Sequence, residues 1–227
     1  MKRSEINRII EEVKEFCRQR QFPLPPFAYW TPEDWKTKGT EYDEIRDNRL
    51  GWDITDYGSG RFAEIGLALF TLRNGNALNP EKYPKPYCEK LLVVGENQVT
   101  PDHHHRSKTE DIINRGGGNL LVQVWEATRD GQILDTPVVV SLDGRLVSVD
   151  AATVLRLQPG ESITLTPYVH HRFWGEPGHG MVLCIEVSSV NDDERDNVFI
   201  PPVPRFSQID EDEEPIHLLC NEYPPAP

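Results

Sequence analysis

The first twenty residues carry apolar side chains at helical spacing. Glu, Lys and Arg occupy the opposite face, and the apolar stripe consists of Ile6, Ile9, Ile10, Val13, Phe16 and Cys17. Ser4 is in position to cap this helix, and prolines at 23, 25 and 26 end it. A second, short helix is predicted after Thr31, because a capping hydroxyl is followed by Pro32 in the first turn. The stripe predicts that the first helix packs against another layer.

From about residue 50 the pattern changes to short apolar runs separated by clusters of Gly, Pro, Asn and Asp. These runs predict strands at residues 62–72, 89–94, 120–126, 138–141, 153–157, 162–165 and 181–187. Strands and helices do not alternate regularly, which favours an antiparallel sandwich or barrel over a doubly wound sheet. Residues 116–118 are all glycine and lack the Lys and Ser or Thr of a phosphate-binding loop, so we expect a tight turn between two strands.

Length and charge narrow the class of protein. The chain has 227 residues and a formal net charge of −13, which suits one domain and opposes binding to nucleic acid or anionic membrane surfaces. No transmembrane run or secretory signal is recognisable, and the four cysteines are widely spaced, so we expect a reduced, cytoplasmic protein. We expect one structural domain in three parts: a helical extension (1–50) packed on a barrel (51–205), and a solvated, acidic, proline-rich C-terminal extension (206–227).

Histidines are concentrated in two places, at 103–105 and at 170–171. On a β-strand His103 and His105 point to the same face, where both can reach one ion. Glu110 follows them, and one histidine of the later pair would complete a set of three imidazoles and one carboxylate. Such a set suits Mn, Fe, Zn, Ni or Co.

This spacing resembles the cupin superfamily. The first cupin motif is matched by His103, His105, Glu110 and Gly117, and the second by Pro159-Gly160-Glu161 and residues 166–173. Asn97 stands where the first motif has a glycine, which shifts a turn and leaves the ligands intact. The resemblance implies an all-β cupin barrel (double-stranded β-helix or jelly roll). It also implies that His171, two residues before Phe173, is the fourth ligand. A bidentate role at the same ion or a two-metal role for His170 is the weaker alternative.

A more specific resemblance is to the D-lyxose ketol-isomerases, metal-dependent cupin sugar isomerases of about this length. It is carried by Glu89–Leu92, His103-x-His105, Lys108, the run from Glu110 to Leu120, Thr166-Pro167, His171, Phe173-Trp174 and the run from Glu186 to Asp193. The resemblance implies interconversion of D-lyxose with D-xylulose, and often of D-mannose with D-fructose. It further implies one divalent metal ion per subunit, Mn²⁺ in particular, and a homodimer.

Aldose–ketose isomerisation moves a proton between C1 and C2 of an open-chain sugar. A metal that chelates the two oxygens acidifies the C–H bond, and a base must carry the proton across a cis-enediol. Glu186 is the candidate base, because it lies in an otherwise apolar strand where burial would raise its pKa toward neutrality. Lys108 is the candidate acid. An outward-facing Glu186 and a solvated Lys108 remain open as structural alternatives.

Three residues are candidate sugar contacts. Lys90 could donate hydrogen bonds to hydroxyl groups, although a lysine at a barrel mouth often only extends to solvent. Phe173 and Trp174, with Trp125, could stack on the sugar, although buried aromatic residues usually belong to the core. The same metal ligands would also suit an Fe(II)-dependent cupin dioxygenase or a non-catalytic sugar-binding cupin, so these two functions remain alternatives.

Overall fold

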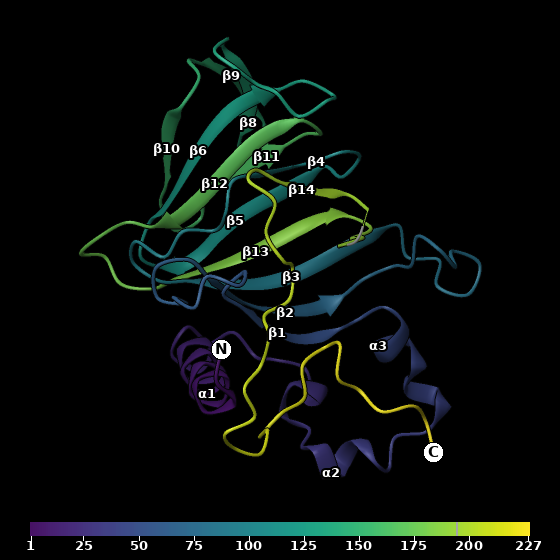
Figure 1. Cartoon of the computed structure of the whole chain (residues 1–227). Coiled ribbons are helices and arrows are strands. Elements are labelled where there is room, and N and C mark those ends of the chain that lie inside the picture. Colours follow the sequence, from purple (N-terminus) through teal and green to yellow (C-terminus); the bar gives the residue numbers. More distant parts are fainter. Residues whose placement is uncertain (194) are drawn as a thin grey trace.

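A computed structural model describes residues 1–193 and 195–227 and consists mainly of two curled antiparallel sheets (Figure 1). The eight-stranded sheet has the order β1 (Gly51–Thr55), β2 (Leu67–Arg73), β3 (Tyr87–Val94), β13 (Val182–Ser189), β5 (Glu110–Gly117), β11 (Ser162–Leu165), β8 (Val138–Leu142), β9 (Arg145–Val149). The six-stranded sheet has the order β10 (Thr153–Leu157), β6 (Leu120–Ala127), β12 (Val169–Gly175), β4 (His103–His105), β14 (Asn197–Phe199), with β7 (Ile133–Leu134) beside β6.

The main hydrophobic core lies between the two sheets. Alternate residues of each strand point inward and pack together, among them Leu92, Ile112, Val122 and Val124. The predicted all-β cupin barrel is therefore confirmed. The glycine turn is confirmed too, because Gly116 and Gly117 have φ values of 145° and 91° where the chain passes from β5 to β6 in the other sheet.

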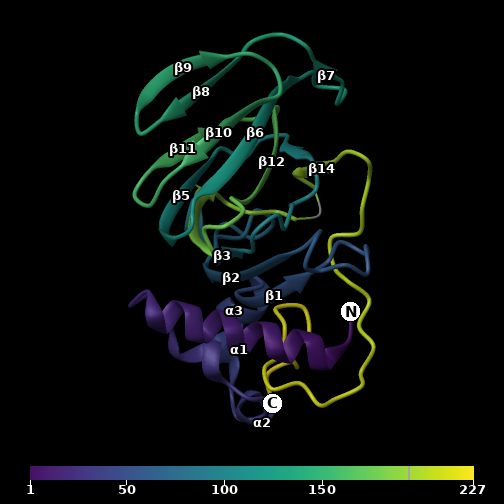
Figure 2. The ribbon, with the colours of Figure 1, turned by 90° about the vertical axis from the view of Figure 1, so that its left-hand side faces the viewer.

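Helix α1 (Arg3–Gln19) covers the outer face of β1 to β3 with its apolar stripe and forms a second core there (Figure 2). Short helical segments follow it: η1 (Pro26–Tyr29), α2 (Pro32–Trp35), η2 (Thr40–Tyr42) and α3 (Asp43–Asp47). Thr31 caps α2 as predicted. The prediction that Ser4 caps α1 is wrong, because Ser4 lies inside the first turn and its N–H donates to Asp212 at 2.9 Å.

The C-terminal segment is not a solvated tail. It runs from β14 across β1 to the helices (Figure 1), and its acidic residues reach the first turn of α1. Glu211 and Glu222 pair with the guanidinium of Arg3, which is only 2% exposed. Tyr223 stacks on Trp35 at 4.0 Å between ring centroids. The prediction of a solvated extension is therefore wrong: the acidic run neutralises a buried arginine and the positive end of the helix dipole.

Two further features of the described residues bear on the class of protein. None of their helices has the length and apolar character that crossing a bilayer requires. Their four cysteines are buried and free of disulfide bonds, as Cys17, Cys88, Cys184 and Cys220.

Candidate metal and active site

Four side chains converge at the cavity between the sheets. His103 and His105 come from β4, Glu110 from the start of β5 and His171 from β12. Their ligand atoms lie within 4.8 Å of one another, and this group could hold a metal ion. The cross-strand pairing of His171 with His103 brings the late histidine to the early pair.

The hydrogen bonds of the imidazole rings fit this interpretation. The Nδ1 atoms of His103 and His171 lie 2.8 and 2.9 Å from the backbone carbonyls of Pro101 and Val169. Because a carbonyl only accepts, Nδ1 carries the hydrogen in each ring and Nε2 is left as a lone-pair donor to a metal. His171 Nε2 is buried without a hydrogen-bond partner among the described residues, as is His105 Nε2. The donor set therefore fits a divalent transition metal.

Glu110 supplies the negative charge of the cluster. It is buried, and its carboxylate oxygens lie 3.3 Å from His105 Nε2 and 3.2 Å from His171 Nε2. Burial raises the pKa of Glu110, but Lys108 and His105 outweigh that effect and hold the pKa well below its usual range. The carboxylate is therefore ionised, as a metal ligand must be.

A row of alternating charges leads away from the cluster. Lys108 Nζ lies 2.7 Å from Glu110 Oε2 and donates to Glu186 Oε1 at 2.9 Å. Lys90 Nζ lies 3.3 Å from the same Glu186 oxygen and donates to Asn191 Oδ1 at 2.7 Å. All four charged side chains are buried, so the alternatives of an outward-facing Glu186 and a solvated Lys108 do not apply.

The predicted direction of the Glu186 pKa shift is wrong. Burial raises the pKa of this carboxyl group, but the ammonium groups of Lys108 and Lys90 outweigh it and bring the pKa below its ordinary value. The same carboxylates raise the pKa of Lys108, against the lowering effect of burial. Each group thus stabilises the charged form of the other.

The other predicted residues divide between two faces of β12. Phe173 lines the cavity together with Lys90, Lys108 and Glu186. Trp174 follows Phe173 on the strand, pairs with Leu121 and contacts Arg172, so it lies on the outer face and not in the cavity. The prediction that Trp174 contacts the sugar is therefore not supported by the geometry.

His170 and Trp125 share that outer face. Their ring centroids lie 5.7 Å apart, and His170 is not part of the four-residue cluster. His171 therefore occupies the position that the resemblance implies for the late histidine, and the alternative of His170 at the same ion does not agree with the fold.

Several residues in the cavity lining or next to it were not singled out from the sequence. Asp196 Oδ2 lies 3.1 Å from His105 Nδ1 and orients that ring. Arg205 Nη2 donates to Asp53 at 2.6 Å and its Nε donates to Asp193 at 3.1 Å. The remaining lining residues that sequence reasoning missed are Tyr57, Leu67, Leu69, Leu92, Thr100, Ile112, Asn197 and Phe199. In the sequence, the acidic residues Asp192, Asp193 and Asp196 are the signal that could have pointed to this part of the site, but their spacing alone assigns them no role.

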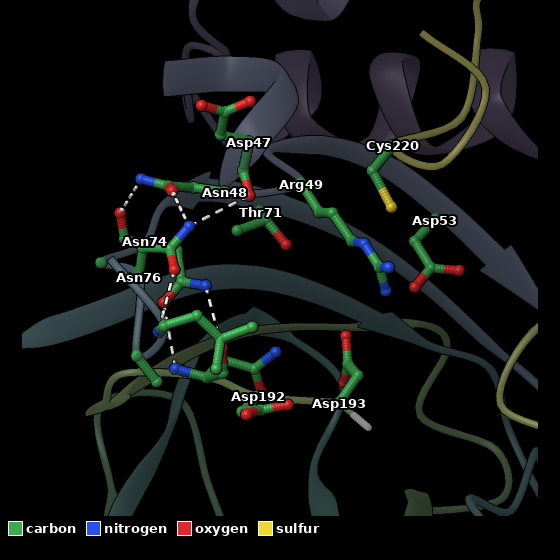
Figure 3. Close-up of a pocket in the computed structure, with 14 residues that line it drawn as sticks. Asp47, Asn48, Arg49, Asp53, Thr71, Asn74, Asn76, Asp192, Asp193 and Cys220 are labelled. Carbon is green, nitrogen blue, oxygen red and sulfur yellow. Dashed lines mark hydrogen bonds between the residues drawn. The ribbon is translucent and has the colours of Figure 1, made fainter. Parts of the chain in front are cut away.

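A second, polar pocket adjoins the cavity, and Asp193 lines both (Figure 3). Its asparagines hold one another: Asn48 donates to the carbonyl of Asn74, Asn76 donates to Asn48, and Asn74 donates to the carbonyl of Asn191. These bonds tie α3 to the segment that follows β13 and so support the loop that carries Asp193.

Comparison with known sequences gives consistent results. A family model described as D-lyxose isomerase matches residues 1–223. A D-lyxose/D-mannose isomerase of Escherichia coli O157:H7 is 50% identical over 224 residues, covering 98% of this chain and 98% of the relative. A D-lyxose/D-mannose isomerase of Serratia proteamaculans is 50% identical over 225 residues, again with 98% of each chain covered.

Comparison with solved structures supports the fold. The L-ribose isomerase of Cellulomonas parahominis, solved with L-psicose, superposes with a TM-score of 0.59 at 16% identity, covering 92% of this chain and 98% of the other. An L-ribose isomerase mutant of Acinetobacter sp. DL28, solved with L-ribose, gives a TM-score of 0.60 at 15% identity over the same shares. At these identities the likeness concerns the fold alone.

Proposed function

The chain belongs to the D-lyxose isomerase family, which makes it an aldose–ketose isomerase, and we propose that it interconverts D-lyxose with D-xylulose and D-mannose with D-fructose. Two relatives at 50% identity over nearly their whole length carry the name D-lyxose/D-mannose isomerase, which supports both sugar pairs. Membership of this family also disfavours the dioxygenase and the non-catalytic sugar-binding cupin.

We propose that His103, His105, Glu110 and His171 hold one divalent metal ion, Mn²⁺ in particular. When bound, the metal supplies Lewis-acid chemistry that acidifies the C–H bond beside the sugar carbonyl. The three imidazoles and one carboxylate also suit Fe, Co, Zn and Ni, and the supply of metal in the cell decides among them.

Glu186 is the proposed base. Its carboxylate lines the same cavity as Glu110 and is kept ionised by two lysines. Because it is already deprotonated, it can accept a proton from the sugar directly. It would take the proton from one carbon of the sugar and return it to the neighbouring carbon through a cis-enediol.

Lys108 is the proposed acid. It stays protonated between Glu110 and Glu186 and can donate a hydrogen bond to a sugar oxygen on which negative charge develops. Lys90, from the strand beside Glu186, and Phe173 are the proposed sugar contacts. Trp174 is not retained in this role.

The observation that carries the mechanism is the Lys108 bridge between the metal cluster and a second buried carboxylate. A cupin that only binds sugar has no need to bury such a charged row, which costs desolvation energy.

The test is to strip the protein with a chelator, restore Mn²⁺, and follow ketose formation from D-lyxose and D-mannose under air and under nitrogen. Metal-dependent formation at equal rates in both atmospheres is expected. Stoichiometric O₂ consumption would favour the dioxygenase, and sugar binding without ketose would favour the binding protein.

We also propose that the protein is a cytoplasmic homodimer. Four free cysteines and an excess of acidic residues suit a reducing, aqueous compartment. The dimer rests on the family resemblance, and sedimentation equilibrium at micromolar concentration tests it.

A further inference from the structure

We propose that Arg205 and Asn197 form a subsite for the terminal hydroxyl group of an open-chain sugar, an inference that rests on the proposed isomerase function. Both residues line the cavity that contains Glu110 and Glu186. Both lie in the last part of the chain, where the segment that starts at β14 passes over the barrel (Figure 1).

Each residue has one buried polar atom without a hydrogen-bond partner among the described residues. These atoms are Nη1 of Arg205 and Oδ1 of Asn197. Such atoms are rare in folded proteins because each forfeits its hydrogen bonds to water. Two of them among the residues that line one cavity indicate that a polar group of a ligand completes their bonding.

Asp193 fixes which atoms are left free. Its Oδ1 accepts hydrogen bonds from Arg205 Nε at 3.1 Å and from Asn197 Nδ2 at 3.2 Å. Because a carboxylate only accepts, the amide of Asn197 must turn its NH₂ toward Asp193 and leave its oxygen free. Arg205 is held from the other side by Asp53, at 2.6 Å from Nη2, which leaves Nη1 free.

A free donor and a free acceptor, on two side chains that share Asp193 Oδ1, match a hydroxyl group. A hydroxyl accepts through its lone pairs and donates its single hydrogen, so it can satisfy Arg205 Nη1 and Asn197 Oδ1 together. A carboxylate or phosphate would satisfy the arginine but would face the amide oxygen without a hydrogen to share. The chemistry of the pair therefore favours an uncharged sugar hydroxyl over an anionic group.

The position of the pair identifies which hydroxyl it binds. The row of charges runs from Glu110 through Glu186 to Lys90, and Lys90 leads through Asn191 toward Asp193. Asp53, which holds Arg205, lies on β1, and three strands separate β1 from Glu110 on β5; Asn197 lies on β14, where it pairs with His105 of β4. The pair therefore extends from the strand beside His105 toward the β1 side of the cavity. With the carbonyl end of the sugar at Glu110 and the base, the opposite end of the carbon chain points to Arg205.

The test compares D-lyxose with 5-deoxy-D-lyxose, which lacks the terminal hydroxyl. In the metal-restored protein, Asn197→Leu should lower kcat/KM for D-lyxose about 10-fold, because it removes one hydrogen bond to a buried hydroxyl. Arg205→Lys should lower it by about 10- to 100-fold, because the lost donor is charged, while a cation remains between Asp53 and Asp193. With 5-deoxy-D-lyxose both variants should match the wild type within about twofold.

A control and a binding measurement separate this inference from the proposed function. Gln123→Leu, which removes an amide on the outer face of β6, should leave both sugars unaffected. Calorimetric titration with D-arabinitol, the alcohol formed by reducing D-lyxose, reports binding without turnover and should weaken about 10-fold in Asn197→Leu. Equal losses with both sugars, or unchanged D-arabinitol affinity, would overturn the subsite. A wild type that binds D-arabinitol but makes no ketose would overturn only the isomerase function.

Discussion

Replacement of Glu186 by Gln tests the proposed base, because it keeps the shape of the side chain and removes its charge. The loss of a positioned base lowers a rate by about 10²- to 10⁴-fold, or about 3–5 kcal/mol in the activation free energy. We expect kcat for D-lyxose to fall in this range. Bound metal should be unchanged, because Glu186 is not one of the four clustered residues.

The same substitution also leaves buried positive charge less well compensated. Breaking a buried ion pair costs about 3–5 kcal/mol when the remaining partner is stranded. Here Lys108 keeps Glu110 at 2.7 Å and Lys90 keeps Asn191 at 2.7 Å, so we expect a smaller loss of unfolding free energy, about 1–3 kcal/mol. Urea denaturation monitored by tryptophan fluorescence measures it and gives the folded fraction to which kcat is normalised.

The control is Glu89→Gln, on the same strand as Lys90, where the carboxylate pairs at 3.1 Å with the half-exposed Arg73 and lies outside the cavity. It should keep kcat within about twofold of the wild type, since surface ion pairs contribute little. A fall of less than tenfold in normalised kcat for Glu186→Gln would refute the assignment of the base, and Lys108 would be tested next.

Three further predictions concern other parts of the molecule. Arg3→Met should lower the free energy of unfolding, measured by urea denaturation, by about 1–2 kcal/mol. This loss is smaller than for a fully buried ion pair because the Glu211 side chain is 56% exposed and can hydrate. An unchanged urea midpoint would contradict the packing of the C-terminal segment on α1. Trp174→Ala should leave KM for D-lyxose unchanged in steady-state assays, whereas a large rise would return this residue to the sugar site. Burial raises the pKa of Asp193, but Arg205 and Lys90 outweigh burial and bring the pKa below its ordinary value, so the folded protein binds fewer protons here than the unfolded chain. Stability should therefore fall as pH drops below about 4, and urea midpoints at pH 3 to 6 measure this. Asp193→Asn should flatten that dependence.

The four clustered side chains could be predicted from the sequence because their geometry depends on local spacing. His103 and His105 share a strand face whatever the rest of the chain does, and Glu110 follows them closely in the sequence. The family resemblance then favoured His171 over His170. The same alternation explains one error: Phe173 and Trp174 are neighbours on a strand, so they cannot both face the cavity.

The remaining errors depend on contacts between distant segments. The pKa of Glu186 is lowered by Lys108 and by Lys90. Lys90 lies directly opposite Glu186 on β3, and the register of two strands so far apart in sequence was not predicted. Strand β5 was not predicted from the apolar runs because its inward positions include Glu110 and Asn114, which are polar. Arg205 and Asn197 belong to a segment with little regular structure, where no periodicity indicates which side chains face the cavity.

The path of the C-terminal segment has a consequence for the order in which the protein can form. The clustered histidines and Glu110 have all been synthesised once the ribosome passes residue 171, but the cavity lining is incomplete until Arg205 has been synthesised. Arg3 is synthesised long before its two carboxylate partners, which lie 208 and 219 residues downstream. Contacts so distant in sequence close large loops and slow folding. A nascent chain therefore contains all four candidate metal ligands well before it contains every residue of the cavity. The last residues to be synthesised complete both the substrate cavity and the packing of the first helix.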